Sequence, residues 1–399
     1  MGLDTTAAAN VLKIDYLPGI REQLNNKIFM YSRLGRNTED FIGSQGYIAL
    51  HSGRNSGIGS RSEGGLLPDA GVQQYNKATF DMKHHYGRIE ISGPVMKRTA
   101  DDMGAYIRAV DSEVKGAVMD LQQDLSRQCL GDATGTLGTP TTATSATQTV
   151  DSVRLFEVGM YVDHIKKDDG TVVNAKRKIT AISQSAKTIT LDASITTAAA
   201  TSIFVRAGNY GNEMFGLSAI VSASDPPQIG GANNYFGNIA RGTSTIYWQA
   251  NEVDAASADL SLDLMQQCID VADQQSNGEI TLILTDYDQW RKYAKILIPD
   301  RRFPTADGQA VKLNGGFQAL KYDEMEVVKD KYMPASTMYF LDENTMFIFE
   351  LSDFDWMDKD GAILSRTPNK DAYEATLFAY QQIACEAPRS NTKLKSLAA

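Results

Sequence analysis

The sequence predicts an α+β fold, in which helices and mostly antiparallel strands occupy separate parts of the chain. Three observations support this class. One long amphipathic helix is predicted over residues 100–130, strand patterns surround two shorter helices between 259 and 351, and the turn-rich stretch 151–207 carries only strand patterns. The last stretch is expected to form a small all-β insertion.

Residues 1–40 are expected to form an extended arm. They begin with small residues and continue with scattered apolar ones, and Pro18 would interrupt any single helix. An arm of this composition has too little apolar surface to fold alone. It is therefore expected to lie on its own body or on a neighbouring molecule.

A long two-stranded excursion is expected next. Residues 47–50 and 72–82 have strand patterns, and the segment between Ser52 and Gly65 is rich in Gly and Ser. A projecting hairpin of this kind is marginally stable by itself. It needs another surface on which to pack.

A strand and a long helix follow directly. Residues 86–94 alternate polar and apolar side chains, and Gly93-Pro94 ends the strand. Apolar side chains then recur every three or four residues from Met103 to Cys129, which predicts one stripe of a single helix. Gly131 stands where a helix commonly stops. The stripe requires a packing partner, and the strand predicted at 372–385 is favoured.

The middle of the chain is predicted to be rich in strands and loops. The threonine-rich stretch 138–147 is expected to be a linker, and residues 207–247 are expected to form ordered loops over a surface. Between them, strands are predicted at residues 161–165, 171–173, 177–182, 188–191 and 202–206.

The last third is predicted to alternate helices and strands. A helix over 259–275 precedes the apolar strand 280–285, and a second helix is capped by Asp286 and ends before Pro299. After a loop at 300–316, strands are predicted at residues 325–328, 338–341 and 346–351, a turn-rich hairpin at 353–369, and a long strand at 372–385. That final strand would return the chain to the long helix.

Composition limits the functional classes. The chain has 399 residues, a formal net charge of −10 and a pI near 5.0, which argues against an adhesive nucleic-acid binder. Cys129, Cys268 and Cys385 are far apart and odd in number, so buried reduced thiols are expected. No stretch approaches a membrane span, and no signal peptide or membrane partner is expected.

The sequence offers no catalytic constellation, nucleotide loop or zinc-ligand spacing. His84 and His85 would point to opposite sides of a strand, so an ordinary surface pair is favoured over a metal site. A calcium-like acidic pattern lacks its distal glutamate, and a hairpin with solvated acids is favoured. Its members are Asp353, Asp355, Asp358 and Asp360. No catalytic residue, metal or cofactor is predicted.

An arm and a hairpin that need another surface, in a chain without catalytic motifs, point to assembly with copies of itself. The chain resembles the major capsid proteins of tailed phages, whose shell subunits have the Hong Kong 97 fold. The resemblance rests on the phrase Tyr86-Gly-Arg-Ile-Glu-Ile-Ser-Gly93, on the helix that ends in Gly131-Asp-Ala-Thr-Gly135, and on the order of the segments.

The resemblance implies a division of the whole chain. Its parts are an N-terminal arm at 1–40, an extended loop at 41–95, a peripheral domain with a spine helix at 96–150 and 346–399, a β-rich insertion at 151–207, and an axial domain with preceding loops at 208–345. The insertion exceeds the minimal fold and is expected to decorate or brace the shell.

The resemblance also implies a function. Hexamers and pentamers of the chain would form the icosahedral shell around the double-stranded DNA genome of a tailed phage, assembled in the host cytoplasm and retained in the virion. Further partners would be portal, scaffolding or decoration proteins, with DNA held without sequence specificity. Contacts between subunits are expected at Arg54, Arg61, Glu63, Lys77, Lys83, Arg108, Asp111, Lys115, Arg301 and Arg302.

Two alternatives remain open. An encapsulin-type nanocompartment shell resembles the same fold, but its chains are typically shorter. A carbohydrate-active enzyme or fibre module would account for the β-rich insertion and the acidic pattern, but it leaves the arm, the extended loop and the long helix unexplained.

Overall fold

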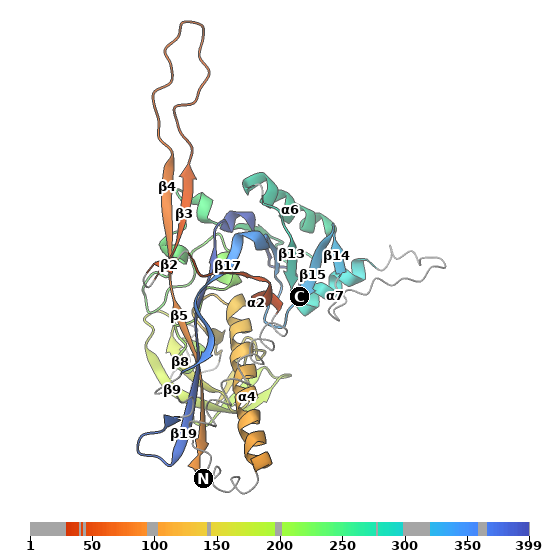
Figure 1. Ribbon diagram of the computed structural model, residues 1–399. Helices are drawn as coiled ribbons and strands as arrows, with labels where there is room; N and C mark the ends of the chain where they lie inside the picture. The colour runs from red at the N-terminus through yellow and green to blue at the C-terminus, as the bar shows by residue number, and fades with distance from the viewer. Residues whose placement is uncertain are drawn as a thin grey trace, which may run out of the picture.

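Figure 1 shows the computed structural model, which describes residues 29–39, 41–42, 45–93, 103–141, 145–195, 202–276, 278–297, 320–357 and 365–398. The described strands form one sheet of five strands, two of six and one of three. The chain is thus a mixed helix and sheet structure, as predicted. The predictions for residues 1–28 and for the loop at 300–316 lie outside the described residues.

The five-stranded sheet is built around β19 (Ala372–Cys385). One edge of β19 pairs antiparallel with β5 (Lys83–Ser92), and the other pairs with β17 (Met346–Trp356) and β18 (Ser365–Arg366). β1 (Gly35–Asn37) adds to β17 in parallel. β17 continues five residues past its predicted end, so the stretch predicted as the start of a turn-rich hairpin is strand.

The long helix is α4 (Met103–Leu130), with 28 residues. Its buried stripe includes Val114, Val118, Leu121 and Leu125. The sequence favours β19 as the partner of this stripe, but α4 packs mainly over β5, at the edge of the sheet; Leu121 of α4 and Leu377 of β19 both lie close to Gly87 of β5. No described helix, α4 included, combines the length and apolar character needed to cross a bilayer.

The end of the predicted arm belongs to the core. Residues 29–33 form the short helix α2 (Phe29–Arg33), which packs on α4. Met30 and Tyr31 are buried, and the Tyr31 hydroxyl donates to the side chain of Gln381 in β19. Residues 29–37 are therefore not part of a separate arm, contrary to the prediction for 1–40.

A second sheet has its own core. Its strand order is β12 (Asn251–Asp254), β20 (Thr392–Lys395), β16 (Met338–Leu341), β13 (Leu282–Thr285), β15 (Met325–Lys329) and β14 (Leu320–Tyr322). The helices α6 (Leu262–Ser276) and α7 (Tyr287–Ile296) accompany it. The Asp286 carboxylate accepts a bond from the Gln289 amide at 2.8 Å, so the predicted cap of α7 is present.

The end of the chain joins another sheet than the predicted residue ranges imply. Residues 392–395, which the sequence assigns with 346–399 to the peripheral domain, form β20 between β12 and β16 of the second sheet. A four-residue strand at the end of a chain carries too little pattern to indicate which sheet it joins. The turns η3 (Glu343–Thr345) and η4 (Pro388–Ser390) lie where the chain passes between the two sheets.

The third sheet is the all-β unit, and it is larger than predicted. Its order is β6 (Thr136–Gly138), β11 (Ser202–Arg206), β8 (Tyr161–Lys166), β9 (Val172–Ser183), β10 (Thr188–Leu191) and β7 (Thr147–Thr149). The threonine-rich linker therefore contains strand residues, because β-branched threonine also favours strands. The two strands predicted at 171–173 and 177–182 are one irregular strand, β9.

Residues 207–250 are not merely loops over a surface. They contain α5 (Leu217–Ile220), η1 (Phe236–Asn238) and η2 (Ile246–Trp248). Phe236 and Trp248 are fully buried, and the Trp248 indole donates to the Phe236 carbonyl at 2.7 Å. The buried Arg241 guanidinium donates to the carbonyls of Ala219 and Ile220, and burial lowers its pKa to about 10. This segment fills the main core.

Candidate assembly surfaces

A two-stranded hairpin projects far from the body of the molecule (Figure 1). β3 (Gln45–Gly53) and β4 (Gln74–Asp81) are antiparallel, and β2 (Phe41–Ile42) pairs with the first residues of β3. The base is anchored by Ile48, Leu50, Ala78 and Phe80, which are buried in the main core. The base thus fixes the direction in which residues 54–73 point.

The tip at residues 54–73 exposes large apolar side chains. The exposed fractions are 82% for Ile58, 91% for Leu66, 84% for Leu67 and 78% for Val72. Local bonds shape the tip: the Gly57 amide donates to Asn55 Oδ1 at 2.7 Å, and the Gly65 amide donates to the Ser62 carbonyl at 3.0 Å. A concentration of solvated apolar groups on one projection is typical of an interaction surface.

Charged residues predicted to contact other subunits lie on the same tip. Arg54, Arg61 and Glu63 are all exposed. The sequence reasoning missed their apolar neighbours. The signal that could have found them is Leu66-Leu67 before Pro68, an apolar pair inside a glycine- and serine-rich segment where no strand or helix pattern could bury it.

Two further candidates already have partners within the chain. The Lys77 ammonium lies over the Tyr47 ring, 3.8 Å from its centroid, across the hairpin. The Lys83 ammonium donates to the Gly211 carbonyl at 2.8 Å, and burial lowers its pKa. Lys77 is exposed and Lys83 half-buried, so only Lys77 presents its charge on the surface.

The polar face of α4 carries the next candidates. Lys115 is exposed, between the exposed Glu113 and the partly exposed Met119. Arg108 and Asp111 belong to α4, but their side chains lie outside the described residues, as do Arg301 and Arg302 altogether. The structure therefore does not bring these candidates together into one site.

A buried ionic cluster joins α4 to the all-β unit. Arg127 of α4 donates to Glu213 and to Asp124, in each case at 3.0 Å, and Arg206 of β11 donates to the same oxygen of Asp124 at 3.0 Å. Burial acts to raise the pKa of Asp124, but Arg127 and Arg206 outweigh burial and lower it. Burial likewise acts to lower the pKa of Arg127, and the two carboxylates raise it instead. Asp124 and Arg127 are therefore held in their charged forms.

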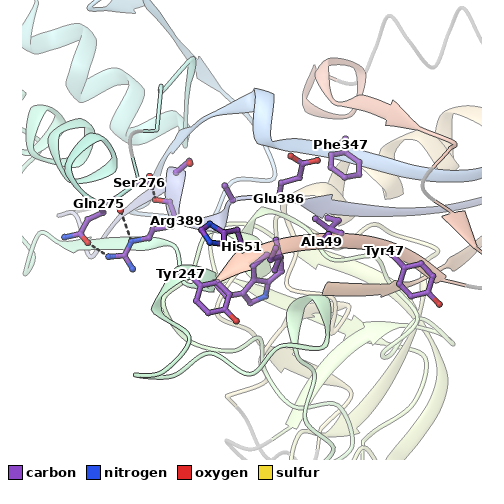
Figure 2. A pocket seen from close by; sticks show the side chains of 14 residues that line it. Tyr47, Ala49, His51, Tyr247, Gln275, Ser276, Phe347, Glu386 and Arg389 are labelled. Atoms are coloured by element: carbon purple, nitrogen blue, oxygen red, sulfur yellow. Dashed lines mark hydrogen bonds between the residues drawn. The ribbon is translucent and has the colours of Figure 1, made fainter. Parts of the chain in front are cut away.

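A groove runs beside the base of the hairpin (Figure 2). Its volume is 690 Å³. One wall is five consecutive residues of β3, from Tyr47 to His51, and Phe347, Glu386 and Arg389 stand across from them. The Arg389 guanidinium is held by the Ile246 carbonyl at 2.8 Å and the Gln275 carbonyl at 3.1 Å.

The weaker chemical patterns of the sequence gather no site among the described residues. Asp353 pairs with Arg36 at 3.1 Å, and no described group of three His, Cys, Asp or Glu side chains could hold a metal. His85 is buried and His84 exposed, so the two rings do point to opposite sides. The three cysteines are buried and free, as expected, and burial raises the pKa of Cys268 and of Cys385 to about 12.

Comparison with solved structures identifies the fold of the chain. No protein-family model and no curated protein matches the sequence. Among solved structures, the chain is similar to a chain of the Cyanophage A-1(L) capsid asymmetric unit, with 12% identity, 93% coverage of both chains and a TM-score of 0.58.

A second similar structure is a chain from the capsid of a native GTA particle, with 12% identity and a TM-score of 0.51. The match covers 94% of this chain and 91% of that chain. The resemblance seen in the sequence predicts the same kind of fold. The chain therefore has the fold of phage capsid subunits, over nearly its whole length.

Proposed function

We propose that this chain is a major capsid protein, which self-assembles into the icosahedral shell of a tailed phage. The hairpin tip is the main support for the proposal, because a chain with the capsid fold extends four solvated apolar side chains beyond the part of its body that the structure describes. Burying a leucine-sized side chain stabilises a contact by about 1.5–3 kcal/mol. Repetition around a closed lattice would sum such contacts into a stable container.

The parts of the subunit take the following roles in the proposal. The projecting hairpin is the extended loop, α4 is the spine helix of the peripheral domain, and the sheet from β12 to β14 belongs to the axial domain. The all-β unit is the insertion that braces or decorates the shell. Hexamers and pentamers would form through the tip and the polar face of α4.

The proposed contact residues are the exposed charges of these two surfaces. Arg54, Arg61 and Glu63 would contact a neighbour from the tip, and Lys115, with Arg108 and Asp111, would receive a neighbour's tip on α4. Lys77, Lys83, Arg301 and Arg302 remain candidates. The net charge of −10 suits a shell that holds double-stranded DNA without adhering to it.

Electron microscopy of the purified chain tests the proposal. We expect hollow shells or six-membered rings for the intact chain. Removing residues 54–65 should abolish these assemblies while helical content, measured by circular dichroism, is kept, because the buried base of the hairpin is retained. A finer variant, Leu66→Ser with Leu67→Ser, should lower assembly yield at least tenfold.

A matched control removes exposed apolar groups elsewhere. Val158 and Val172 of the all-β unit are 65% and 48% exposed, and Val158→Ser with Val172→Ser should leave shell formation intact. Unimpaired shells in the tip variants, or a chain that stays monomeric in all conditions, would refute the proposal. Shells from infected cells that enclose enzymes instead of DNA would favour a nanocompartment.

A further inference from the structure

The helix α7 presents a basic and aromatic face to solvent. The side chain of Arg291 is 72% exposed, and Lys295 is exposed one turn further along. Lys329 of β15 is exposed beside them, with its ammonium 3.9 Å from the centroid of the Trp290 ring and 5.4 Å from that of Tyr287. Solvated cations beside partly exposed aromatic rings are typical of a surface that binds an acidic partner.

The cations of this basic face of α7 exceed its own carboxylates. Asp288 pairs with Arg291. In the part of the chain that the structure describes, neither Lys295 nor Lys329 forms an ion pair with a carboxylate. The face therefore carries a surplus of positive charge on a chain whose net charge is −10.

The outer face of α6 has the opposite character. Its exposed side chains are three carboxylates and three amides, Asp263, Asp270, Asp273, Gln266, Gln267 and Gln274, which helical periodicity places on one side. Asp270 accepts a bond from the Gln266 amide at 2.8 Å, and no described Lys or Arg forms an ion pair with the three carboxylates. This acidic face of α6 is suited to a basic partner.

The two faces match in length. Asp263 and Asp273 are about 15 Å apart along α6, and Tyr287, where Lys329 lies, is about 12 Å from Lys295 along α7. Three carboxylates can therefore face three cations. Each helix also exposes an apolar side chain at its start, 38% for Leu262 and 46% for Tyr287, which can add apolar area to a contact.

Within one chain the two faces form no ion pair among the described residues. α6 lies against β12 and β20, near one edge of the second sheet, and α7 lies against β15, near the other edge. A contact between α7 of one copy and α6 of the next would join unlike surfaces. It would leave one face of each copy free for a further copy, and such head-to-tail contacts can close into rings.

We propose that the basic face of α7 docks on the acidic face of α6 in a second copy of this chain. The contact adds to that of the hairpin tip, and its place in a ring rests on the proposed function. The association of two copies through these faces does not require a shell and is measured separately from it.

Charge reversal in the full-length chain tests the contact. One variant carries Asp270→Lys with Asp273→Lys, and the other carries Lys295→Glu with Lys329→Glu. Each variant alone opposes like charges, so its self-association at low salt, measured by sedimentation, should be at least tenfold weaker than that of the unchanged chain. An equal mixture of the two variants should restore association, because each reversed face then meets its opposite.

Matched controls reverse exposed charges of the all-β unit. Asp168→Lys with Asp192→Lys, and Lys166→Glu with Lys178→Glu, change the net charge by the same amounts and should leave association unchanged. Circular dichroism should show the same helical content in all four variants. Equal losses in variants and controls would show an effect of net charge alone and would overturn the contact.

Ring size gives a readout specific to a head-to-tail contact. In the mixture the two variants must alternate around a ring, so electron microscopy should show six-membered rings and no five-membered ones. Five-membered rings of the mixture, unimpaired association of either variant alone, or no recovery on mixing would overturn the contact. Loss in the lysine variant without recovery on mixing would place another partner, such as DNA, on α7. Recovery on mixing without any shells would contradict the proposed function and leave the contact standing.

Discussion

Arg127 is the charged side chain that ties α4 to the segment 207–250. It is 8% exposed and binds both Glu213 and Asp124, whose side chains are 3% and 11% exposed. Arg127→Met should lower the free energy of unfolding by about 3–5 kcal/mol, because the buried Glu213 carboxylate loses its cation and Asp124 keeps Arg206 alone. Urea unfolding of unassembled subunits, followed by tryptophan fluorescence, measures the loss.

The matched control is an exposed pair of the same spacing. Arg291 and Asp288 are also three residues apart, with side chains 72% and 58% exposed. Arg291→Met should change stability by less than about 1 kcal/mol. A similar loss for both variants would show that burial is not what makes Arg127 important.

His85 should make the fold sensitive to mild acid. The residue is 5% exposed, and burial lowers its pKa to about 4, below an unfolded value near 6.5. Between these pH values the unfolded chain binds a proton that the folded chain does not, so stability falls as the pH falls. Lowering the pH from 7 to 5 should cost about 2 kcal/mol from this residue.

Substitution isolates the contribution of His85. His85→Gln should reduce the loss of stability between pH 7 and 5, whereas His84→Gln, on the exposed face of the same strand, should not. Some slope should remain, because burial also lowers the pKa of His164. Asp124, whose pKa is lowered, contributes only below about pH 4. An unchanged slope in His85→Gln would contradict the assignment.

Single residues were predictable from the sequence only where composition or local spacing determines their role. Buried cysteines and the Asp286 cap follow from composition and local spacing. Arg127 does not, because a charged residue between apolar helix positions looks solvated until its partner is known. That partner, Glu213, is 86 residues away in sequence.

Two glycines show how differently the elements tolerate a methyl group. Gly116 lies inside α4, and a Cβ added there would have nothing within 4 Å, so Gly116→Ala should stabilise the subunit by about 1 kcal/mol through helix propensity. A Cβ added at Gly216, which precedes α5, would overlap the Gln128 carbonyl oxygen. Gly216→Ala should cost at least about 1–3 kcal/mol, because backbone would have to move.

Thermal unfolding of the two unassembled variants gives the comparison. The melting temperature should rise for Gly116→Ala and fall for Gly216→Ala. An equal rise of the melting temperature in both variants would mean that the close contact between Gly216, before α5, and the end of α4 relaxes easily. A fall for Gly116→Ala would mean that the open space beside α4 is needed by the fold.

Long helices and strands, whose patterns repeat several times, were predictable, and short ones were not. The 28 residues of α4 and the 14 of β19 repeat their patterns several times. The three-residue strands β6 and β7 lie in a threonine-rich stretch whose composition suits loop and strand equally. Their pairing with β11 and β10 depends on contacts that local patterns do not contain.

At the scale of the whole molecule, the order of segments was the most informative feature of the sequence. Arm, hairpin, long helix and returning strand pointed to the capsid fold at an identity of only 12% to the solved structures. The groove beside β3 was beyond prediction, since its walls come from five separate parts of the chain. Sequence order places elements, but a surface between them requires their packing.

The all-β unit should be removable as a block. Its core, built around Val162, Ile179 and Phe204, is separate from the main core. The chain enters the unit through β6 and leaves it through the neighbouring strand β11. Thr136 of β6 lies directly across from Val205 of β11, so a two-residue turn can join Thr136 to Arg206 in place of residues 137–205. Arg206 would keep its bond to Asp124.

We expect the shortened chain to fold, with the melting temperature of the main body lowered by only a few degrees. The remaining cost comes from lost contacts such as that between Arg154 and the Met333 carbonyl at 3.3 Å. Calorimetry of the intact chain should then show the all-β unit as a separate transition that the shortened chain lacks. If the shortened chain is insoluble, the unit is part of the folding core and not an insertion, because its separate hydrophobic cluster would then be needed by the rest.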